Sequence, residues 1–196
     1  DVQLLFLPLS HVLGMISMLS GVASGTPVAL GNGVRALLED LRDVKPTYMV
    51  GVPRIYEKIA EKIRIMSQDF NFLSRNLFEG GVRSSRQMEE AQAQGQRADF
   101  SVRVALDLAR RTIFPRYKEL FGGRMRFVVS GGAPLDLDVG WLISALGISV
   151  LEGFGLTETS GATHLNRQGS TRLGTVGPAL PMVETRIGEC SEILVR

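Results

Sequence analysis

Short apolar runs that alternate with segments of helical spacing are the feature that most constrains the fold of this chain. In the first quarter the apolar runs span residues 2–7, 25–30 and 48–52. Between them, small residues up to about position 20 and leucines within residues 34–44 have the spacing of helices. Strands that alternate with helices favour a parallel sheet covered by helices. We therefore expect an α/β fold, a mostly parallel sheet with helices on both faces.

Helical spacing dominates the middle of the chain. Ile55, Ile59 and Ile63 recur on one side of a helix that begins at Pro53, where proline is well tolerated. A second stripe runs through residues 102–113. The Gln-, Gly- and Ser-rich residues 80–96 are expected to form an exposed or mobile connection. Residues 54–119 are thus predicted to be a helical insertion within the sheet domain.

Two later apolar runs each lead directly into glycine-rich residues. Residues 125–129 precede SGGAP, and residues 148–151 precede EGFGLTET. Asp136 or Asp138 is expected to cap the helix between them. Because the carboxyl ends of parallel strands face the same side, both segments should be neighbouring loops at the edge where open α/β folds bind ligands.

The residue types of the second segment suit a phosphate ligand. Glycine lets a backbone approach a ligand closely. The Thr157 hydroxyl can donate to a phosphate oxygen, the Glu158 carboxylate suits Mg²⁺, and Phe154 offers a flat face to a base. Taken alone, the same residues are equally compatible with a loop that binds nothing.

Composition narrows the class of protein. The net charge of +2 is too small to indicate nucleic acid or an anionic membrane as the main partner. The single Cys190 cannot form an internal disulfide. The apolar start lacks the basic residues of a signal peptide, and Gly, Ser and Pro interrupt residues 12–30, so a cytoplasmic protein is expected. Both ends cut through strand-like runs, and we expect an internal part of a longer protein.

The order of the motifs is more specific than any one of them. Neither GxxxxGK[ST] nor GxGxxG is present. The chain reads LPLSHV at 7–12, VPRIYEKI at 52–59, SGGAPL at 130–135, EGFGLTET at 152–159 and GTVGPALPMVETRIG at 174–188. This ordered set resembles the AMP-forming adenylate synthetases, and VPRIYEKI with the long helical insertion looks most like bacterial long-chain fatty acyl-CoA ligases.

The resemblance implies a two-step reaction. A fatty acid and ATP give acyl-AMP and pyrophosphate, and the thiol of coenzyme A then forms the thioester. The implied cofactors are ATP, Mg²⁺ and coenzyme A as co-substrate, and the implied setting is fatty acid metabolism. Peripheral membrane association through the lipid substrate is a further expectation. The acyl chain length and the oligomeric state are not readable from the sequence.

The resemblance also implies roles for individual residues. His11 would lie near the reacting carboxylate, Thr157 would contact phosphate, and Glu158 would ligate Mg²⁺. Phe154 stands where the family usually has a tyrosine. His164 matches no family role, and without the resemblance His11 is read as a helix-start residue. The residues implied to surround the nucleotide and acyl-adenylate are Val12, Gly131, Gly132, Ala133, Pro134, Glu152, Gly153, Phe154, Gly155 and Thr157.

Some family features are altered or missing. Met182 and Ser191 replace glycines and put local turn geometry in doubt. The family's phosphate loop, its ribose-binding aspartate and its C-terminal lobe with a lysine do not occur in these residues, so the 196 residues alone are expected to be inactive. Two alternatives stay open: a fatty acyl-AMP ligase that passes the adenylate to a carrier protein, and a non-catalytic nucleotide-binding or structural module of the same fold.

Overall fold

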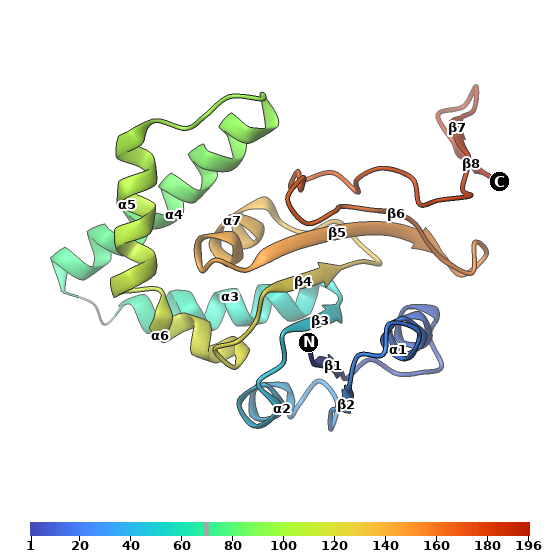
Figure 1. Ribbon diagram of the computed structural model, residues 1–196, viewed down its shortest axis with the longest axis horizontal. Helices are drawn as coiled ribbons and strands as arrows, with labels where there is room; N and C mark the ends of the chain where they lie inside the picture. Colours follow the sequence, from blue (N-terminus) through green and yellow to red (C-terminus); the bar gives the residue numbers. More distant parts are fainter. Residues whose placement is uncertain (69–70) are drawn as a thin grey trace.

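A six-stranded sheet forms the centre of the computed structural model, which describes residues 1–68 and 71–196 (Figure 1). The strand order is β2-β1-β3-β4-β5-β6, and all neighbours are parallel except β5 and β6. The bounds are β1 Gln3–Leu5, β2 Val28–Leu30, β3 Tyr48–Gly51, β4 Phe127–Ser130, β5 Ser149–Leu156 and β6 Gly161–Leu165. The predicted α/β fold with a mostly parallel sheet is confirmed.

Helices cover both faces of this sheet. On one face lies α1 (Val12–Ala23), where the side-chain amide of Gln3 donates to the Ser17 carbonyl at 2.9 Å. On the other face lie α2 (Leu37–Val44), α3 (Pro53–Gln68) and α7 (Leu137–Ala145), whose apolar residues share one core cluster with Leu4, Met49 and Val128. Since strand side chains alternate between faces, neighbouring residues of one strand serve different layers.

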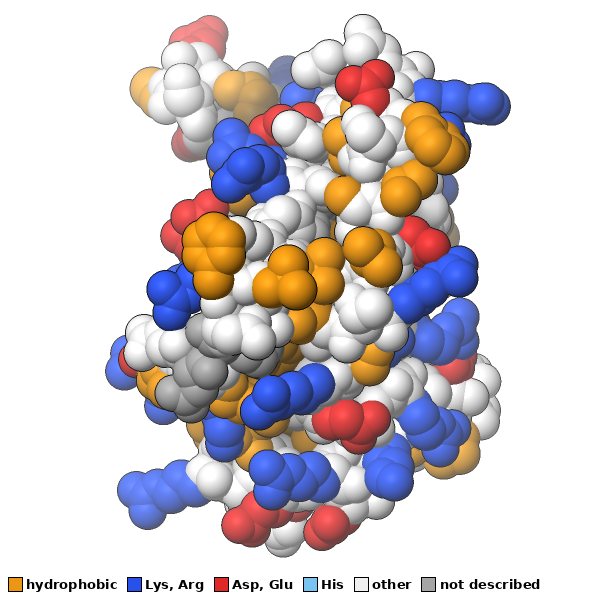
Figure 2. Space-filling view, turned by 90° about the vertical axis from the view of Figure 1, so that its left-hand side faces the viewer, with side chains coloured by type: hydrophobic (Ala, Val, Ile, Leu, Met, Phe, Trp, Pro, Cys, Tyr) orange, Lys and Arg blue, Asp and Glu red, His pale blue; other side chains and the backbone are white. Residues whose placement is uncertain are grey.

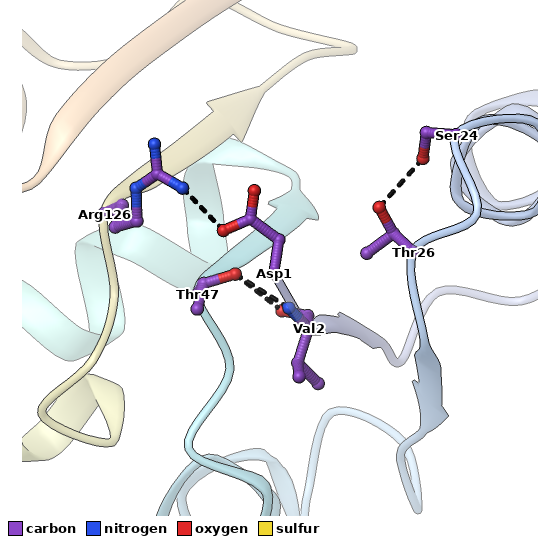
Figure 3. A network of polar contacts seen from close by, with 6 residues as sticks. All are labelled: Asp1, Val2, Ser24, Thr26, Thr47 and Arg126. Atoms are coloured by element: carbon purple, nitrogen blue, oxygen red, sulfur yellow. Dashed lines mark hydrogen bonds and ion pairs between the residues drawn. The ribbon is translucent and has the colours of Figure 1, made fainter.

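Polar contacts fix the first strand in place (Figure 3). The Val2 N–H donates to the Thr47 hydroxyl at 2.8 Å, and Arg126 pairs with Asp1 at 2.6 Å. These contacts join the start of β1 to the residues just before β3 and β4. The register of the parallel strands is therefore supported by side chains as well as by backbone hydrogen bonds.

Helices also fill the stretch between β3 and β4. After α3 come α4 (Phe72–Ala93), α5 (Phe100–Thr112), α6 (Pro115–Lys118) and the 3₁₀ turn η1 (Glu119–Phe121). The α4–α5 pair forms the left end of the molecule in Figure 1. The expectation that residues 80–96 are a connection is wrong, because helix α4 continues to Ala93. A Cβ on Gly81 would lie 2.6 Å from the Ala109 Cβ, so glycine here permits close packing of α4 and α5.

The ends of two helices show why they begin and stop where they do. The Asp136 carboxylate accepts from the N–H groups of Asp138 at 2.9 Å and Val139 at 3.2 Å, so Asp136 and not Asp138 caps α7. Helix α2 ends at Val44, because its C-cap residue Lys45 is left-handed with φ 48° and Pro46 follows. Within the described part of the chain, the helices are too short or too polar to cross a lipid bilayer.

Strands β7 (Thr185–Ile187) and β8 (Ile193–Val195) form a separate antiparallel hairpin. Met182 has φ 67° and Ser191 has φ 60°. These are the two positions where the resemblance predicts glycine, and both are in the left-handed region that favours glycine. The substituted residues therefore keep the turn geometry at a cost in backbone strain of roughly 1 kcal/mol each.

Candidate functional site

The two glycine-rich segments meet at one edge of the sheet. Strands β4 and β5 are paired in parallel up to Ser130 and Glu152. The next residues are Gly131 and Gly153, and a Cβ built on Gly131 would lie 3.7 Å from the Gly153 carbonyl oxygen. The prediction that the segments are neighbours at the carboxyl ends of parallel strands is confirmed.

The second segment is not a loop as expected. Strand β5 continues from Glu152 to Leu156 because its last residues pair antiparallel with β6. Gly155 fits this hairpin tightly, since a Cβ there would lie 2.0 Å from the Gly161 carbonyl oxygen. The turn comes later, where the Thr159 hydroxyl accepts from the Leu156 N–H at 3.0 Å and donates to the Gly161 carbonyl at 2.8 Å.

A cavity of about 460 Å³ lies between α1 and the sheet, next to these glycines. Helix α1 contributes residues at spacings of three and four, which fall on one side of a helix. The cavity is lined by Val12, Leu13, Ile16, Ser17, Ser20, Ser24, Tyr48, Val50, Phe127, Val129, Gly131, Gly132, Gly153, Phe154, Gly155, Gly161, Ala162, Leu165 and Leu180. Its size and its mostly apolar wall are typical of small-molecule sites.

The sheet side of this cavity was not found from the sequence. The rings of Tyr48 and Phe127 stack with centroids 4.9 Å apart and planes 9° apart, and Val50 and Val129 continue the wall. Burial raises the pKa of Tyr48, against a smaller opposing effect of its hydrogen bond to Thr26. The available signal was the alternation of the strands that precede the glycines, because every second residue of β3 and β4 faces the cavity.

Hydroxyl groups lie at one end of the cavity. The Ser24 and Thr26 hydroxyls lie 2.9 Å apart, at the end of α1 and before β2 (Figure 3). The Tyr48 hydroxyl donates to Gln3 Oε1 at 3.0 Å. These polar groups therefore have partners within the protein, and the glycines stand at the opposite end.

Six of the residues predicted to bind the nucleotide or acyl-adenylate line this cavity: Val12, Gly131, Gly132, Gly153, Phe154 and Gly155. His11 is exposed at the start of α1, where its side chain makes no capping hydrogen bond. Ala133 and Pro134 are exposed just beyond Gly132. The structure thus brings the glycines and Phe154 together with α1, and leaves these three residues at the rim or outside.

Glu152 has a different position from its glycine neighbour. Its side chain is buried, and Oε1 accepts from the Gly174 N–H at 2.7 Å. Its carbonyl accepts from the Asn166 N–H at 3.0 Å. The carboxylate therefore holds the GTVG segment against β5, and only the backbone of Glu152 adjoins the predicted nucleotide site.

Phe154 and His164 face each other across the β5–β6 hairpin. Their ring centroids are 6.2 Å apart at 59°. The two ring nitrogens of His164 lie 3.0 Å from the Thr163 hydroxyl and 3.3 Å from the Thr185 hydroxyl. His164 is thus a structural contact of the hairpin, in line with its lack of a family role.

Thr157 and Glu158 are exposed in the turn after β5. Across residues 1–68 and 71–196, no three His, Cys, Asp or Glu side chains come close enough to hold a metal ion by themselves. A single carboxylate suits Mg²⁺ that is bound mainly through the phosphates of a substrate. Glu158 fits that kind of site and does not fit a metal site built from protein alone.

A second hollow of about 380 Å³ lies between α3, α4 and α7. It contains Arg64, Arg83, Arg86 and Trp141, and the Arg86 guanidinium lies 4.4 Å from the Trp141 ring centroid. None of the predicted site residues lines it. The geometry therefore favours the cavity beside α1 as the functional site.

Comparison with known proteins shows which family the chain belongs to. The AMP-binding enzyme family matches residues 1–194. The long-chain-fatty-acid–CoA ligase FadD15 of Mycobacterium bovis is 31% identical over 193 residues, which cover 98% of this chain and 32% of the relative. Long chain acyl-CoA synthetase 1 of Arabidopsis thaliana is 34% identical over 196 residues, with 98% and 29% covered. The chain spans about a third of the length of these relatives.

Solved structures show the same fold. A malonyl-CoA ligase with methylmalonyl-CoA and AMP bound has a TM-score of 0.62 at 28% identity, and the match covers 100% of this chain and 34% of that one. O-succinylbenzoate coenzyme A synthetase of Bacillus subtilis, in complex with ATP and magnesium ion, has a TM-score of 0.57 at 17% identity, with 99% and 30% covered. With its ordered motifs and its glycine-bordered cavity, the chain belongs to the AMP-binding enzyme family.

Proposed function

We propose that this chain is the central part of the adenylate-forming domain of an ATP-dependent long-chain fatty acid–CoA ligase that acts in the cytoplasm. The observation that carries the proposal is the cavity that begins at Gly131, Gly132 and Gly153 and extends along α1 between apolar walls. An acyl-adenylate has a polar nucleotide at one end and an apolar chain at the other. The glycine end of the cavity suits the nucleotide, and the mostly apolar part along α1 suits the acyl chain.

The length of the cavity supports a long-chain acid. The wall formed by α1 and its C-cap residue includes Val12, Ile16, Ser20 and Ser24, which are spaced by four. From first to last they span about 18 Å at 1.5 Å per residue. An extended chain advances about 1.3 Å per bonded carbon, so this wall accommodates roughly fourteen carbons. The names of the relatives agree, since they are long-chain ligases and synthetases.

The residues around the glycine end have separate proposed roles. The flat ring of Phe154 packs on the base, and the backbone at Gly131 and Gly132 approaches the nucleotide without a Cβ between them. The Thr157 hydroxyl donates to a phosphate oxygen. Bound Mg²⁺ would neutralise negative charge when a carboxylate approaches ATP, and Glu158 is the residue that would hold it. His11, exposed at the start of α1, is proposed to reach the reacting carboxylate.

The proposal is tested by Glu158→Gln in the full-length protein that contains this chain. Glutamine keeps the shape but loses the charge, so we expect single-turnover formation of acyl-AMP to fall at least about a hundredfold. Thr157→Val should lower it by roughly tenfold, because one neutral donor is lost while the metal ligand remains. Glu189→Gln changes a glutamate that is also exposed, in the β7–β8 turn, and should have no effect.

The same experiment separates the proposal from its alternatives. Because Glu158 is exposed in a turn, the unfolding temperature of Glu158→Gln should match that of the unchanged protein. Acyl-AMP formation within threefold of the unchanged protein would remove Glu158 as the metal ligand. If acyl-AMP forms but addition of coenzyme A yields no thioester, the protein is an acyl-AMP ligase. If no acyl-AMP forms even in the unchanged protein, the chain is a non-catalytic module.

A further inference from the structure

Helix α5 is apolar on two sides, and among the residues that the structure describes only one of these sides packs against another helix. Leu106 and Ala109 are buried against α4. On another side, the residues Phe100, Val104 and Leu108 are 73%, 48% and 50% exposed. Their spacing of four places them in one row, here named the α5 stripe. Exposed apolar rows of this kind mark interaction surfaces.

Basic residues accompany the α5 stripe. The Arg103 guanidinium lies 5.8 Å from the Phe100 ring centroid. Arg111 pairs with Asp107 at 2.9 Å, with both side chains well exposed, and Arg97 precedes the helix. Figure 2, which views the left-hand side of Figure 1, shows apolar side chains exposed across the middle of this face, with Lys and Arg side chains around them and fewer Asp and Glu side chains between.

The charge of this region differs from that of the whole chain. Residues 53–121 contain 13 Lys and Arg against 9 Asp and Glu, a net charge of +4. The remaining residues contain 9 and 11, a net charge of −2. The small net charge of the full sequence therefore hides a basic region at the helical end.

A second exposed row, on α1, provides the contrast. Met15, Leu19 and Val22 are 49%, 58% and 64% exposed and form the α1 stripe. Helix α1 contains no charged residue at all. Interfacial helices that rest on lipid combine an apolar row with basic residues, which attract anionic headgroups. The α5 stripe has both components, and the α1 stripe has only the first.

We propose that the α5 stripe docks on the surface of an anionic lipid bilayer. Phe100, Val104 and Leu108 would enter the boundary between headgroups and acyl chains, and Arg97 and Arg103 would face the headgroup phosphates, while Asp107 offsets the charge of Arg111. The proposal adds to the proposed function a route by which a long-chain acid leaves the membrane for the enzyme. The surface itself is argued from exposure and charge, independently of that activity.

The test is flotation of the full-length protein that contains this chain with vesicles, in the absence of ATP, fatty acid and coenzyme A. Vesicles of phosphatidylcholine alone are compared with vesicles in which one-third of the lipid is phosphatidylglycerol. We expect binding to the anionic vesicles, and at least about tenfold weaker binding for the triple variant Phe100→Ser, Val104→Ser, Leu108→Ser. The matched control Met15→Ser, Leu19→Ser, Val22→Ser removes an equally exposed row and should bind like the unchanged protein.

The charge component has its own variant. Arg97→Gln with Arg103→Gln leaves the apolar row intact and should weaken binding to anionic vesicles by roughly tenfold or more, with a similar loss on adding salt. This pair also tests the proposal if the triple α5 variant does not fold, as checked by circular dichroism.

Three results would overturn the proposal. One is equal loss of binding in the α1 and α5 triple variants, and another is binding that does not depend on anionic lipid. The third is a dimer of the chain, seen by sedimentation, that the α5 variant converts to monomer, since the row would then be an interface between copies. Because no ligase substrate is present, each of these results leaves the proposed activity untouched.

Discussion

The two faces of the sheet differ in packing. Side chains fill the face that packs against α3 and α7, here called the filled face, whereas the face beneath α1 holds the cavity. Met49 and Val128 are fully buried on the filled face. Their chain neighbours Val50 and Val129 point the other way and line the cavity. In each pair of neighbouring residues, one therefore packs in the core and the next lines the cavity. The comparison shows how a four-residue strand separates the two requirements by alternation alone.

The sharpest way to break this comparison is a matched pair of substitutions in β4. Val128→Ala removes two methyl groups from the filled face and should cost about 2 kcal/mol of unfolding free energy, as transfer and cavity terms add. Val129→Ala removes the same atoms from a wall that already borders a cavity and should cost well under half as much. Urea unfolding measures both, and equal losses would show that the two faces are packed alike.

The same pair should reverse its order when binding is measured. Val129→Ala should change the affinity of the full-length protein for a fatty acyl-adenylate analogue, while Val128→Ala should leave it nearly unchanged. A binding defect in Val128→Ala alone would indicate that the ligand binds on the filled face.

Two tyrosines sharpen the comparison at high pH. On the filled face Tyr56 is fully buried, and its hydroxyl donates to the Val129 carbonyl at 2.8 Å. Burial raises the pKa of Tyr56 above its ordinary value. The folded protein therefore keeps a proton that the unfolded chain releases above about pH 10. Its contribution to stability is complete below that pH and is lost above it, at up to about 1.4 kcal/mol per pH unit.

The expected readout is the slope of unfolding free energy between about pH 10 and 11. Tyr56→Phe should flatten that slope most, although it costs about 1 kcal/mol at neutral pH through the lost hydrogen bond. Tyr48→Phe, on the cavity face, should flatten it less, because the hydrogen bond to Thr26 partly offsets the effect of burial on the Tyr48 pKa. A steeper dependence on Tyr48 than on Tyr56 would contradict the burial assigned to the two faces.

Much of the fold could be predicted from local patterns. The alternation of apolar runs and helices, Pro53 at a helix start and the paired glycine segments predicted the parallel sheet and the neighbourhood of Gly131 and Gly153. Those features depend on nearest neighbours in sequence or on the handed connection of parallel strands.

The errors came from long-range partners. Residues 80–96 are rich in residues that favour turns, but Gly81 lies against Ala109 of α5 and Phe114 just beyond that helix, and this packing stabilises α4. Strand β5 extends beyond its predicted end because β6, which follows the turn, pairs with it. The cavity wall of Tyr48 and Phe127 joins residues 79 positions apart, so no single segment of the sequence contains the signal.

The central claim is that the cavity beneath α1 holds an acyl-adenylate, with its nucleotide end at the glycines. Its most direct test is photolabelling of the full-length protein by a non-hydrolysable acyl-adenylate analogue with a diazirine at the end of its acyl chain. Adducts are mapped by mass spectrometry, with excess unlabelled analogue as the competitor. The account predicts competed adducts at the end of the cavity away from the glycines, on Ser20, Ser24, Tyr48 and Phe127. Competed adducts confined to α3, α4 and α7, around the hollow at Arg64 and Trp141, would contradict it.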